Sequence, residues 1–394
     1  MTTPTPGPGG HEQGPAGPGG HEPSPAGSQG HEPSPEKART ESPRIGRRTF
    51  LLRTAEVGLG VTAAGLVGAN LLRRPARKWD ASAFPPVGGS RVAVLRAASY
   101  DRDLEAVVAD GLRQVGADVR GKRVLLKPNL VEFDPSTAIN TDPRLVAAAV
   151  LAVRRLGAAS VTVGEGPGHR RDTEYVVSRS GLLDALRAVE APFVDLNLAP
   201  LVRRPLRSRF TDLRELWLPD IVVNSDVVVS MPKMKTHHWG GVTLSLKNCF
   251  GCVPGRVYGW PKNVLHWAGL EGSIVDVAAA VRPDLVIVDG IVGMEGNGPI
   301  NGERKDAGLV VFGTDPVATD ATAAYAMGVD PERVGYLTDA GRFLGQLHLD
   351  ELTQAGEDPG RAAVPFRLVP AFAHLRTGSP ADAPPVRSGK GSGA

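Results

Sequence analysis

The residues best suited to chemistry gather in one segment, 232–255, with the sequence PKMKTHHWGGVTLSLKNCFGCVPG. It holds amines, imidazoles, an amide and both thiols of the chain: Lys233, Lys235, His237, His238, Lys247, Asn248, Cys249 and Cys252. Ionisable groups with perturbed pKa values tend to gather at functional sites, so this cluster predicts one. Taken singly, each residue also fits a structural role, with lysines in solvent, histidines capping backbone groups and cysteines packed as small hydrophobes.

Three residues of the segment are predicted to be catalytic, namely Lys235, His237 and Lys247. A desolvated lysine amine gives up its proton readily and histidine titrates near neutral pH, so both types can contact an anion or transfer a proton. His238 and Asn248 are predicted to contact the cofactor or ligand beside them. The apolar run 227–230 comes directly before the segment, which predicts a site at the end of a buried strand.

Four residues are predicted metal ligands, namely Cys249, Cys252, Asp289 and Glu295. Two cysteines at this spacing can bind a soft metal or cycle as a disulfide. Two thiolates do not complete a tetrahedral site, so histidines, carboxylates or a second subunit would supply the other ligands. The candidate cofactors are therefore a metal ion or an iron–sulfur cluster. For the two acidic residues, turn formation in a loop rich in Asn and Gly is the alternative.

Two loops that leave predicted strands supply further ligand-binding residues. The first carries Lys127 and Asn129, and the second carries Gly164, Glu165 and Gly166. A glycine loop at the carboxyl end of a strand brings backbone N–H groups close to an anion, and a lysine beside it adds charge. The glycine spacing is not that of a dinucleotide fingerprint, and a proline removes one donor. A plain tight turn and a surface lysine are the structural alternatives.

Several blocks together give the chain a family resemblance. They are Lys127-Pro128-Asn129, Gly164-Glu165-Gly166, 226–230, Pro232 to His237, Lys247-Asn248, Gly251 to Gly255, Asp289-Gly290 and 313–320. Over residues 90–345 the sequence resembles the bacterial and archaeal family called domain of unknown function 362. The resemblance implies no settled activity. Some members append a ferredoxin-like cysteine cluster and look like iron–sulfur proteins, but this chain lacks that cluster, so the role does not carry over.

A fainter similarity points to the nickel-dependent lactate racemases. It rests on the spacing of His237, Gly240-Gly241, Lys247 and Pro254-Gly255. This similarity implies a racemase-like reaction on a hydroxy acid as one alternative function.

Composition and motif searches exclude several classes of protein. The net charge of +3 over 394 residues is nearly balanced, so no nucleic-acid partner follows. Two cysteines do not make a disulfide framework. The stretch 116–123 mimics a phosphate-binding loop, but it lacks the Ser or Thr and precedes a strand. The chain has no G-x-S-x-G elbow and no His-Glu-x-x-His pair, so serine hydrolase and zinc protease functions have no support.

The N-terminal region predicts export. Residues 1–44 form a low-complexity Pro/Gly/Ser tail that is too polar to fold. Residues 45–72 resemble a twin-arginine signal, with Arg47-Arg48 ahead of a mildly apolar run, and residues 73–90 form a linker. The prediction is export across the cytoplasmic membrane by the twin-arginine machinery, or anchoring to the outer face of that membrane. A short buried helix with basic flanks is the alternative.

Strand and helix patterns alternate through residues 91–350 and predict one α/β fold. Strands are predicted at 92–95, 124–126, 161–163, 193–196, 221–223, 227–229, 285–288 and 309–312, with helices between them. The expected architecture is a mainly parallel sheet with helices on both faces, in one or two lobes. Residues 351–394 are predicted to be a largely disordered extension.

The sequence therefore predicts an exported α/β protein that binds an anionic small molecule or a metal-bearing cofactor at the carboxyl edge of its sheet. A non-catalytic ligand-binding protein of the cell envelope is the second hypothesis, beside the racemase-like enzyme. A homo-oligomer is compatible with both.

Overall fold

The structure, a computed structural model, describes residues 77–86, 88–168 and 172–378. The predicted tail (1–44) and export signal (45–72) lie outside the described residues. Within the described ranges, no helix has both the length and the apolar character needed to cross a membrane.

A ten-stranded sheet forms the centre of the described chain. Its main path runs β12 (Thr353–Gly356), β1 (Arg91–Arg96), β11 (Glu303–Gly313), β10 (Leu285–Glu295), β7 (Val227–Met231), β2 (Arg123–Pro128), β3 (Ser160–Glu165) and β4 (Phe193–Asp195). Off this path, β8 (Lys233–His237) pairs with β10, and β9 (Gly241–Thr243) pairs with β8. The ladders from β10 to β4 are parallel and those of β11 are antiparallel, so the sheet is mainly parallel, as predicted.

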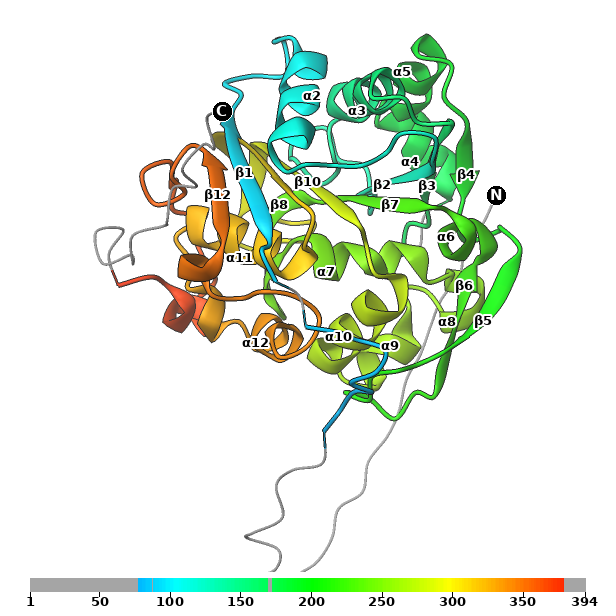
Figure 1. Ribbon diagram of the computed structural model, residues 1–394, viewed down its shortest axis with the longest axis vertical. Coiled ribbons are helices and arrows are strands. Elements are labelled where there is room, and N and C mark those ends of the chain that lie inside the picture. The colour runs from blue at the N-terminus through cyan, green and yellow to red at the C-terminus, as the bar shows by residue number, and fades with distance from the viewer. Residues whose placement is uncertain (1–76, 87, 169–171, 379–394) are drawn as a thin grey trace, which may run out of the picture. The chain divides into compact units, whose positions relative to one another are not determined.

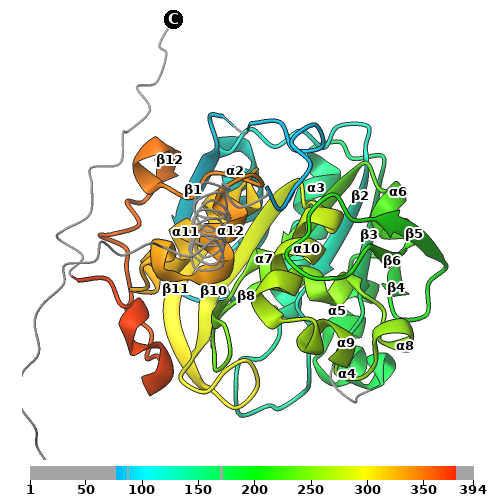
Figure 2. The same ribbon diagram turned by 90° about the horizontal axis from the view of Figure 1, so that it is seen from below.

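Helices cover both faces of the sheet, which confirms the predicted architecture (Figure 1). One face carries α2 (Leu104–Gln114), α3 (Pro143–Arg155), α4 (Thr173–Arg179) and α5 (Leu182–Ala188). The other carries α7 (Ser245–Asn248), α10 (Leu270–Val281), α11 (Pro316–Ala326) and α12 (Gly335–Gly341). Successive residues of a strand point to opposite faces, so Val286 and Val288 enter one hydrophobic core while Leu285 and Ile287 enter the other. The long strands β10 and β11 run side by side through the molecule (Figure 2).

The helix starts follow from local sequence. Asp142 and Asp315 cap α3 and α11, each accepting a hydrogen bond from a backbone N–H of the first turn, and a proline follows each cap. Such a proline has no N–H to lose and already holds the helical φ angle. Gly157 and Gly328 adopt positive φ angles just after the same two helices. The sequence pattern of Asp-Pro before each helix and Gly after it is the capping signal that marks these boundaries.

Two sequence predictions about elements were wrong. Residues 221–223, predicted as a strand, lie in the helix α6 (Asp220–Asn224), which follows a separate two-stranded sheet of β5 (Leu201–Pro205) and β6 (Glu215–Pro219). There the tertiary contacts of α6 with this small sheet override the β-branched propensity.

The predicted boundary at residue 350 was also wrong, because β12 extends the main sheet beside β1. The side chains of Phe366 and Leu375 are buried in the core after it. The 3₁₀ helices η3 (Leu349–Glu351) and η4 (Pro370–Leu375) flank β12 in the chain, and a further one, η2 (Pro331–Arg333), precedes α12. Part of the predicted linker 73–90 packs on the same domain, where the ring of Trp79 stacks on that of Phe343 with centroids 4.9 Å apart.

Candidate functional site

A cavity of about 350 Å³ lies beyond the carboxyl ends of β2 and β3, beside β8. Its chemically capable lining residues are Lys127, Asn129, Glu165, Lys235, His237, His238, Thr243, Lys247, Asn248, Lys262 and His266. Pro232 separates β7 from β8, so the chain shifts from its pairing with β2 and continues along β10. Lys235 and His237 are two residues apart on β8 and therefore project to the same side of the strand.

Most of the predicted site residues meet in this cavity. The three predicted catalytic residues all line it, as do Lys127, Asn129, Glu165, Gly166, His238 and Asn248 from the predicted ligand-binding set. Gly164 does not line the cavity. A side chain at Gly164 would press on Leu125 and Leu196, so this glycine serves the packing of β3.

Lys127 and Glu165 form a buried ion pair at the floor of the site. Lys127 Nζ also donates to Pro128 O at 2.9 Å and to Asn248 Oδ1 at 3.0 Å, so all three of its donors are in use. Glu165 Oε1 accepts from the N–H of Gly166 at 2.9 Å. This pair is internally satisfied, and it holds the β2 and β3 ends together rather than presenting charge to a ligand.

Gly251 covers this ion pair. It lies in η1 (Cys249–Cys252), and a Cβ atom on it would collide with the Glu165 carboxylate and the Lys127 amine. Only a glycine lets the backbone approach the pair this closely. This close approach gives a physical reason for a glycine at the position between the two cysteines.

Lys235 has no carboxylate partner among the described residues. Its Nζ donates to Ile139 O at 2.8 Å and to Pro299 O at 3.3 Å, and the side chain is fully buried. Burial, with the positive charges of Lys233 and Lys247 added, holds the pKa of Lys235 well below its usual range. A bound anion would offset both the desolvation of the amine and its repulsion by the neighbouring lysines.

Two further lysines enter the cavity from different segments. Lys247, on α7, lies with its Nζ 3.6 Å from the centroid of the Phe250 ring and has no hydrogen-bond partner in the described part of the chain. Lys262 precedes α9 (Asn263–Trp267), and its Nζ donates to Gly166 O at 2.8 Å and to Phe250 O at 2.6 Å. Burial lowers the pKa of each amine to about 7. Both amines are therefore poised between their charged and neutral forms at neutral pH.

His237 has a fixed tautomer. Its Nδ1 accepts hydrogen bonds from the backbone N–H groups of Trp239 at 3.0 Å and Gly240 at 3.2 Å. A neutral imidazole with Nδ1 as acceptor carries its proton on Nε2. Burial, together with the charges of Lys247 and other neighbours, holds the pKa of His237 well below its usual range. This residue is thus a neutral hydrogen-bond donor toward a ligand.

His238 and His266 have the opposite arrangement. His238 Nδ1 lies 2.5 Å from Gly298 O and His266 Nδ1 lies 3.1 Å from Lys262 O, so each Nδ1 carries the proton. A ring protonated at Nδ1 alone has an acceptor at Nε2. The Trp239 ring makes edge contacts with both imidazoles.

Two polar atoms of the lining are buried without a hydrogen-bond partner among the described residues, namely Asn129 Oδ1 and Thr243 Oγ1. Thr243 lies directly across from Lys235 in the β8–β9 ladder. Buried polar groups of this kind normally find a partner, because an unmade hydrogen bond is costly. A ligand or a water in the cavity would supply one.

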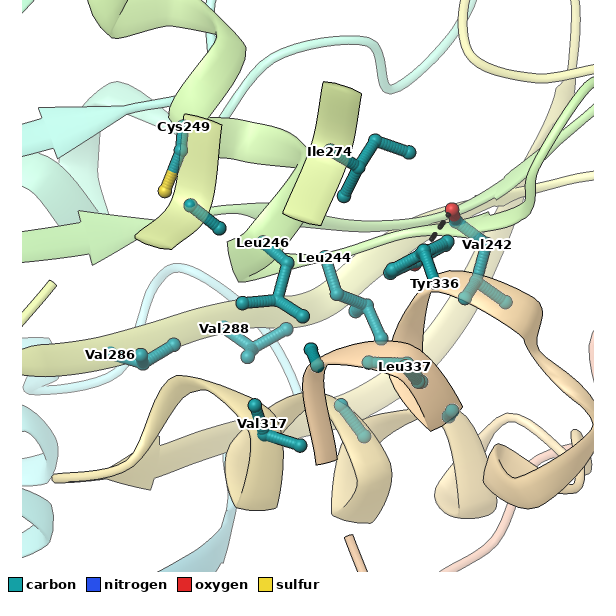
Figure 3. Packing of buried hydrophobic residues seen from close by; sticks show 14 of the residues in the cluster. Val242, Leu244, Leu246, Cys249, Ile274, Val286, Val288, Val317, Tyr336 and Leu337 are labelled. Atoms are coloured by element: carbon teal, nitrogen blue, oxygen red, sulfur yellow. Dashed lines mark hydrogen bonds between the residues drawn. The ribbon is translucent and has the colours of Figure 1, made fainter. Parts of the chain in front are cut away.

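The predicted cysteine site is not formed. Both thiols are fully buried, and Cys249 belongs to the same hydrophobic core as Leu246 and Val286 (Figure 3). Burial raises the pKa of Cys252 to about 12 and that of Cys249 as well, so both thiols are protonated in the metal-free chain. The cysteines are core residues, as the structural alternative had it.

The predicted acidic ligands are also engaged elsewhere. Asp289 accepts from Lys233 Nζ at 2.6 Å and from Tyr100 OH at 2.7 Å, in a buried cluster outside the cavity lining. Glu295 lies 3.5 Å from Lys305 Nζ. No three His, Cys, Asp or Glu residues come together as a metal site in the part of the chain that the structure describes. The donor set does not fit the predicted metal or iron–sulfur cofactor.

Several lining residues were not predicted as ligand contacts, among them Lys262, Thr243, Trp239, Phe250 and His266. Lys262 follows a Gly-Trp-Pro turn and has a positive φ of 67°, which is rare for a residue with a side chain. Thr243 sits in a short strand with no motif of its own. Only the folded chain brings either residue to the cavity.

The described chain is thus an α/β protein with a lysine-rich cavity at the carboxyl edge of its sheet. The chain belongs to the family described as domain of unknown function (DUF362), whose model matches residues 124–325. This confirms the family resemblance, and the matched range contains every predicted site residue. The predicted twin-arginine signal lies outside it.

One relative and two solved structures are similar to parts of the chain. A thylakoid-associated protein of Synechocystis is 33% identical over 223 residues, which cover 54% of this chain and 65% of that protein. The lactate racemase apoprotein of Thermoanaerobacterium thermosaccharolyticum has 11% identity and a TM-score of 0.40, over 61% of this chain and 57% of its own. A Thermotoga maritima protein has 14% identity and a TM-score of 0.33, over 51% and 52% of the two chains.

Proposed function

We propose that this protein binds a small anionic molecule, a carboxylate or a phosphate, in the cavity beside β8. The observation that carries the proposal is an imbalance of charge. Lys235, Lys247 and Lys262 line the cavity, and Glu165, the one carboxylate in the described lining, is already paired with Lys127. Buried amines without counterions are unfavourable, and an anion would supply the missing charge.

The hydrogen-bonding groups support the same ligand. Lysine amines and the Nε2–H of His237 are donors, which suits the oxygens of an anion. Asn129 Oδ1 lacks a donor in the described chain, so a ligand hydroxyl or amide beside the anionic group would complete the set. Because the Lys247 amine is poised near pH 7, it can hold the anion and also exchange a proton with it.

A matched panel of ligands tests this proposal. Thermal stability and calorimetric binding would be measured with inorganic phosphate, malonate, succinate and benzoate, and with the neutral amides of the three carboxylates. We expect at least one anion to bind and its neutral counterpart to bind far more weakly. A hydrogen bond to a charged group contributes about 1.5–3 kcal/mol, so Lys247→Met should lower the affinity for that anion roughly 10- to 100-fold.

The control is Lys122→Met, which removes a lysine that pairs with Asp118 outside the cavity lining. This variant should bind the anion as the parent does. Equal binding of anions and amides, or equal losses in the two lysine variants, would refute an anion site in this cavity.

A further inference from the structure

Aromatic rings form a continuous series along the cavity. His237 stacks on His238 with centroids 5.2 Å apart, and His238 meets Trp239 edge-on at 4.7 Å. Trp239 contacts His266 at 5.9 Å, and His266 contacts Phe250 at 6.1 Å. All five residues line the cavity. One part of its wall is therefore built from π-systems rather than from aliphatic groups.

Trp239 differs from the other rings in its exposure. Its side chain is 62% exposed, whereas His237 and Phe250 are 5% and 6% exposed. An exposed tryptophan that lines a cavity presents a large apolar face to whatever enters. The edge contacts with His238 and His266 hold this ring in place, so it does not have to be ordered when a ligand arrives.

The cationic and aromatic parts of the cavity adjoin each other. Lys247 Nζ lies over the Phe250 ring at 3.6 Å, and Phe250 is the last ring of the series. The cavity volume of about 350 Å³ is also within the range of sites for organic ligands and far larger than a bare inorganic anion requires. A ligand that fills it needs a second part beside its charged group.

From this arrangement we infer that the ligand is an anion that carries a planar aromatic ring, with the ring stacked on Trp239 and the charged group among the lysines. The inference rests on the proposed anion-binding function and names its ligand class. Each aromatic side chain can stack on any flat ring, so the site selects for planarity rather than for one ring system.

Two pairs of anions with equal charge test the inference. Benzoate is compared with cyclohexanecarboxylate, and adenosine monophosphate with ribose 5-phosphate, by calorimetric titration of the full chain. The members of each pair differ in the planar ring. Stacking on an aromatic side chain should make at least one aromatic member bind roughly 5- to 100-fold more tightly than its partner.

Two tryptophan variants locate the effect. Trp239→Leu should bring the ratio of the affinities for the aromatic and the non-aromatic member close to one, while the affinity for the non-aromatic member stays unchanged. Trp267→Leu is the matched control, because Trp267 is 80% exposed on the neighbouring α9 but does not line the cavity. It should keep the parent's ratio, and quenching of fluorescence by the aromatic ligand should be lost only in Trp239→Leu.

The outcomes separate the two proposals. If both members of each pair bind equally, or if the preference survives Trp239→Leu, the aromatic inference is overturned while anion binding stands. If none of the four ligands binds and the anions of the first panel also fail, the proposed function falls and takes this inference with it.

Discussion

Lys127 and Lys247 both line the cavity, but their amines have different surroundings. The amine of Lys127 makes three hydrogen bonds, one of them to the Glu165 carboxylate. The amine of Lys247 lies over a ring, without a hydrogen-bond partner in the described chain. We assign Lys127 a structural role and Lys247 a ligand-binding role. The sequence shows two lysines in the predicted site and does not show that a carboxylate distant in the chain neutralises one of them.

Removing the charge of Glu165 should destabilise the fold. Glu165→Gln leaves the Lys127 amine buried without its counterion, and breaking such a pair costs about 3–5 kcal/mol. Urea-induced unfolding measures this loss. Asp184→Asn is the control, because Asp184 pairs with Arg187 at the surface, where both side chains are more than two thirds exposed. Its cost should stay below about 1 kcal/mol. Similar losses in the two variants would contradict the structural role of the buried pair.

Lys247 is positioned by a helix from elsewhere in the chain. The short helix α7 carries Lys247 and Asn248, and its first N–H groups, from Ser245 and Leu246, donate to the two oxygens of Asp320 at 2.7 and 2.8 Å. Asp320 belongs to α11, which is otherwise rich in alanine and buried. A carboxylate buried in such a helix needs a partner, and the sequence does not show which one it has. The fold supplies it in the form of a helix N-terminus.

Asp320→Asn should disturb both stability and binding. The amide keeps one acceptor and turns an N–H toward the other backbone N–H, which leaves a buried donor unpaired at a cost of about 1–3 kcal/mol. The substitution should also displace α7 and so lower the affinity for the anion that binds best to the parent. Asp330→Asn, at the partly exposed cap of η2, serves as the control for a lost capping charge. Lower stability with unchanged anion affinity would show that Asp320 does not position Lys247.

Whether a helix or strand can be predicted from the sequence depends on how far along the chain the interactions that form it reach. Caps such as Asp142 and Asp315 act on the next few residues, so the sequence predicts α3 and α11 correctly. The strand β8 has the sequence KMKTH, which has no apolar alternation, and it exists because it pairs with β10 and β9. The short strand β12 likewise depends on β1. Pairings between distant segments are not encoded in a local pattern.

At the scale of the whole molecule, the cationic character is local. The chain carries a net charge of only +3, yet three lysines without carboxylate partners share one cavity in the described structure. A general attraction to polyanions therefore does not follow, whereas the proposed binding of one small anion fits this local charge. The export signal at 45–72 stays a prediction, since it lies outside both the described residues and the family match.

The lowered pKa values of the lysines make both stability and ligand binding depend on pH. The folded-state pKa values of Lys247 and Lys262, about 7, lie below the ordinary value of 10.5. Between these values the unfolded chain binds more protons than the folded chain, so these two groups make the ligand-free fold more stable as pH rises. Anion binding has the opposite dependence. It favours the charged amines, so affinity should fall as pH rises above about 7.

Calorimetric titration of the best-binding anion at roughly pH 8, in buffers with different ionisation enthalpies, tests the central claim most directly. The account predicts proton uptake on binding, up to one proton for each of Lys235, Lys247 and Lys262, and a reduced uptake in the double variant Lys247→Met/Lys262→Met. Binding without proton uptake, or an uptake that the double variant leaves unchanged, would contradict the claim that an anion completes the charge of these cavity amines.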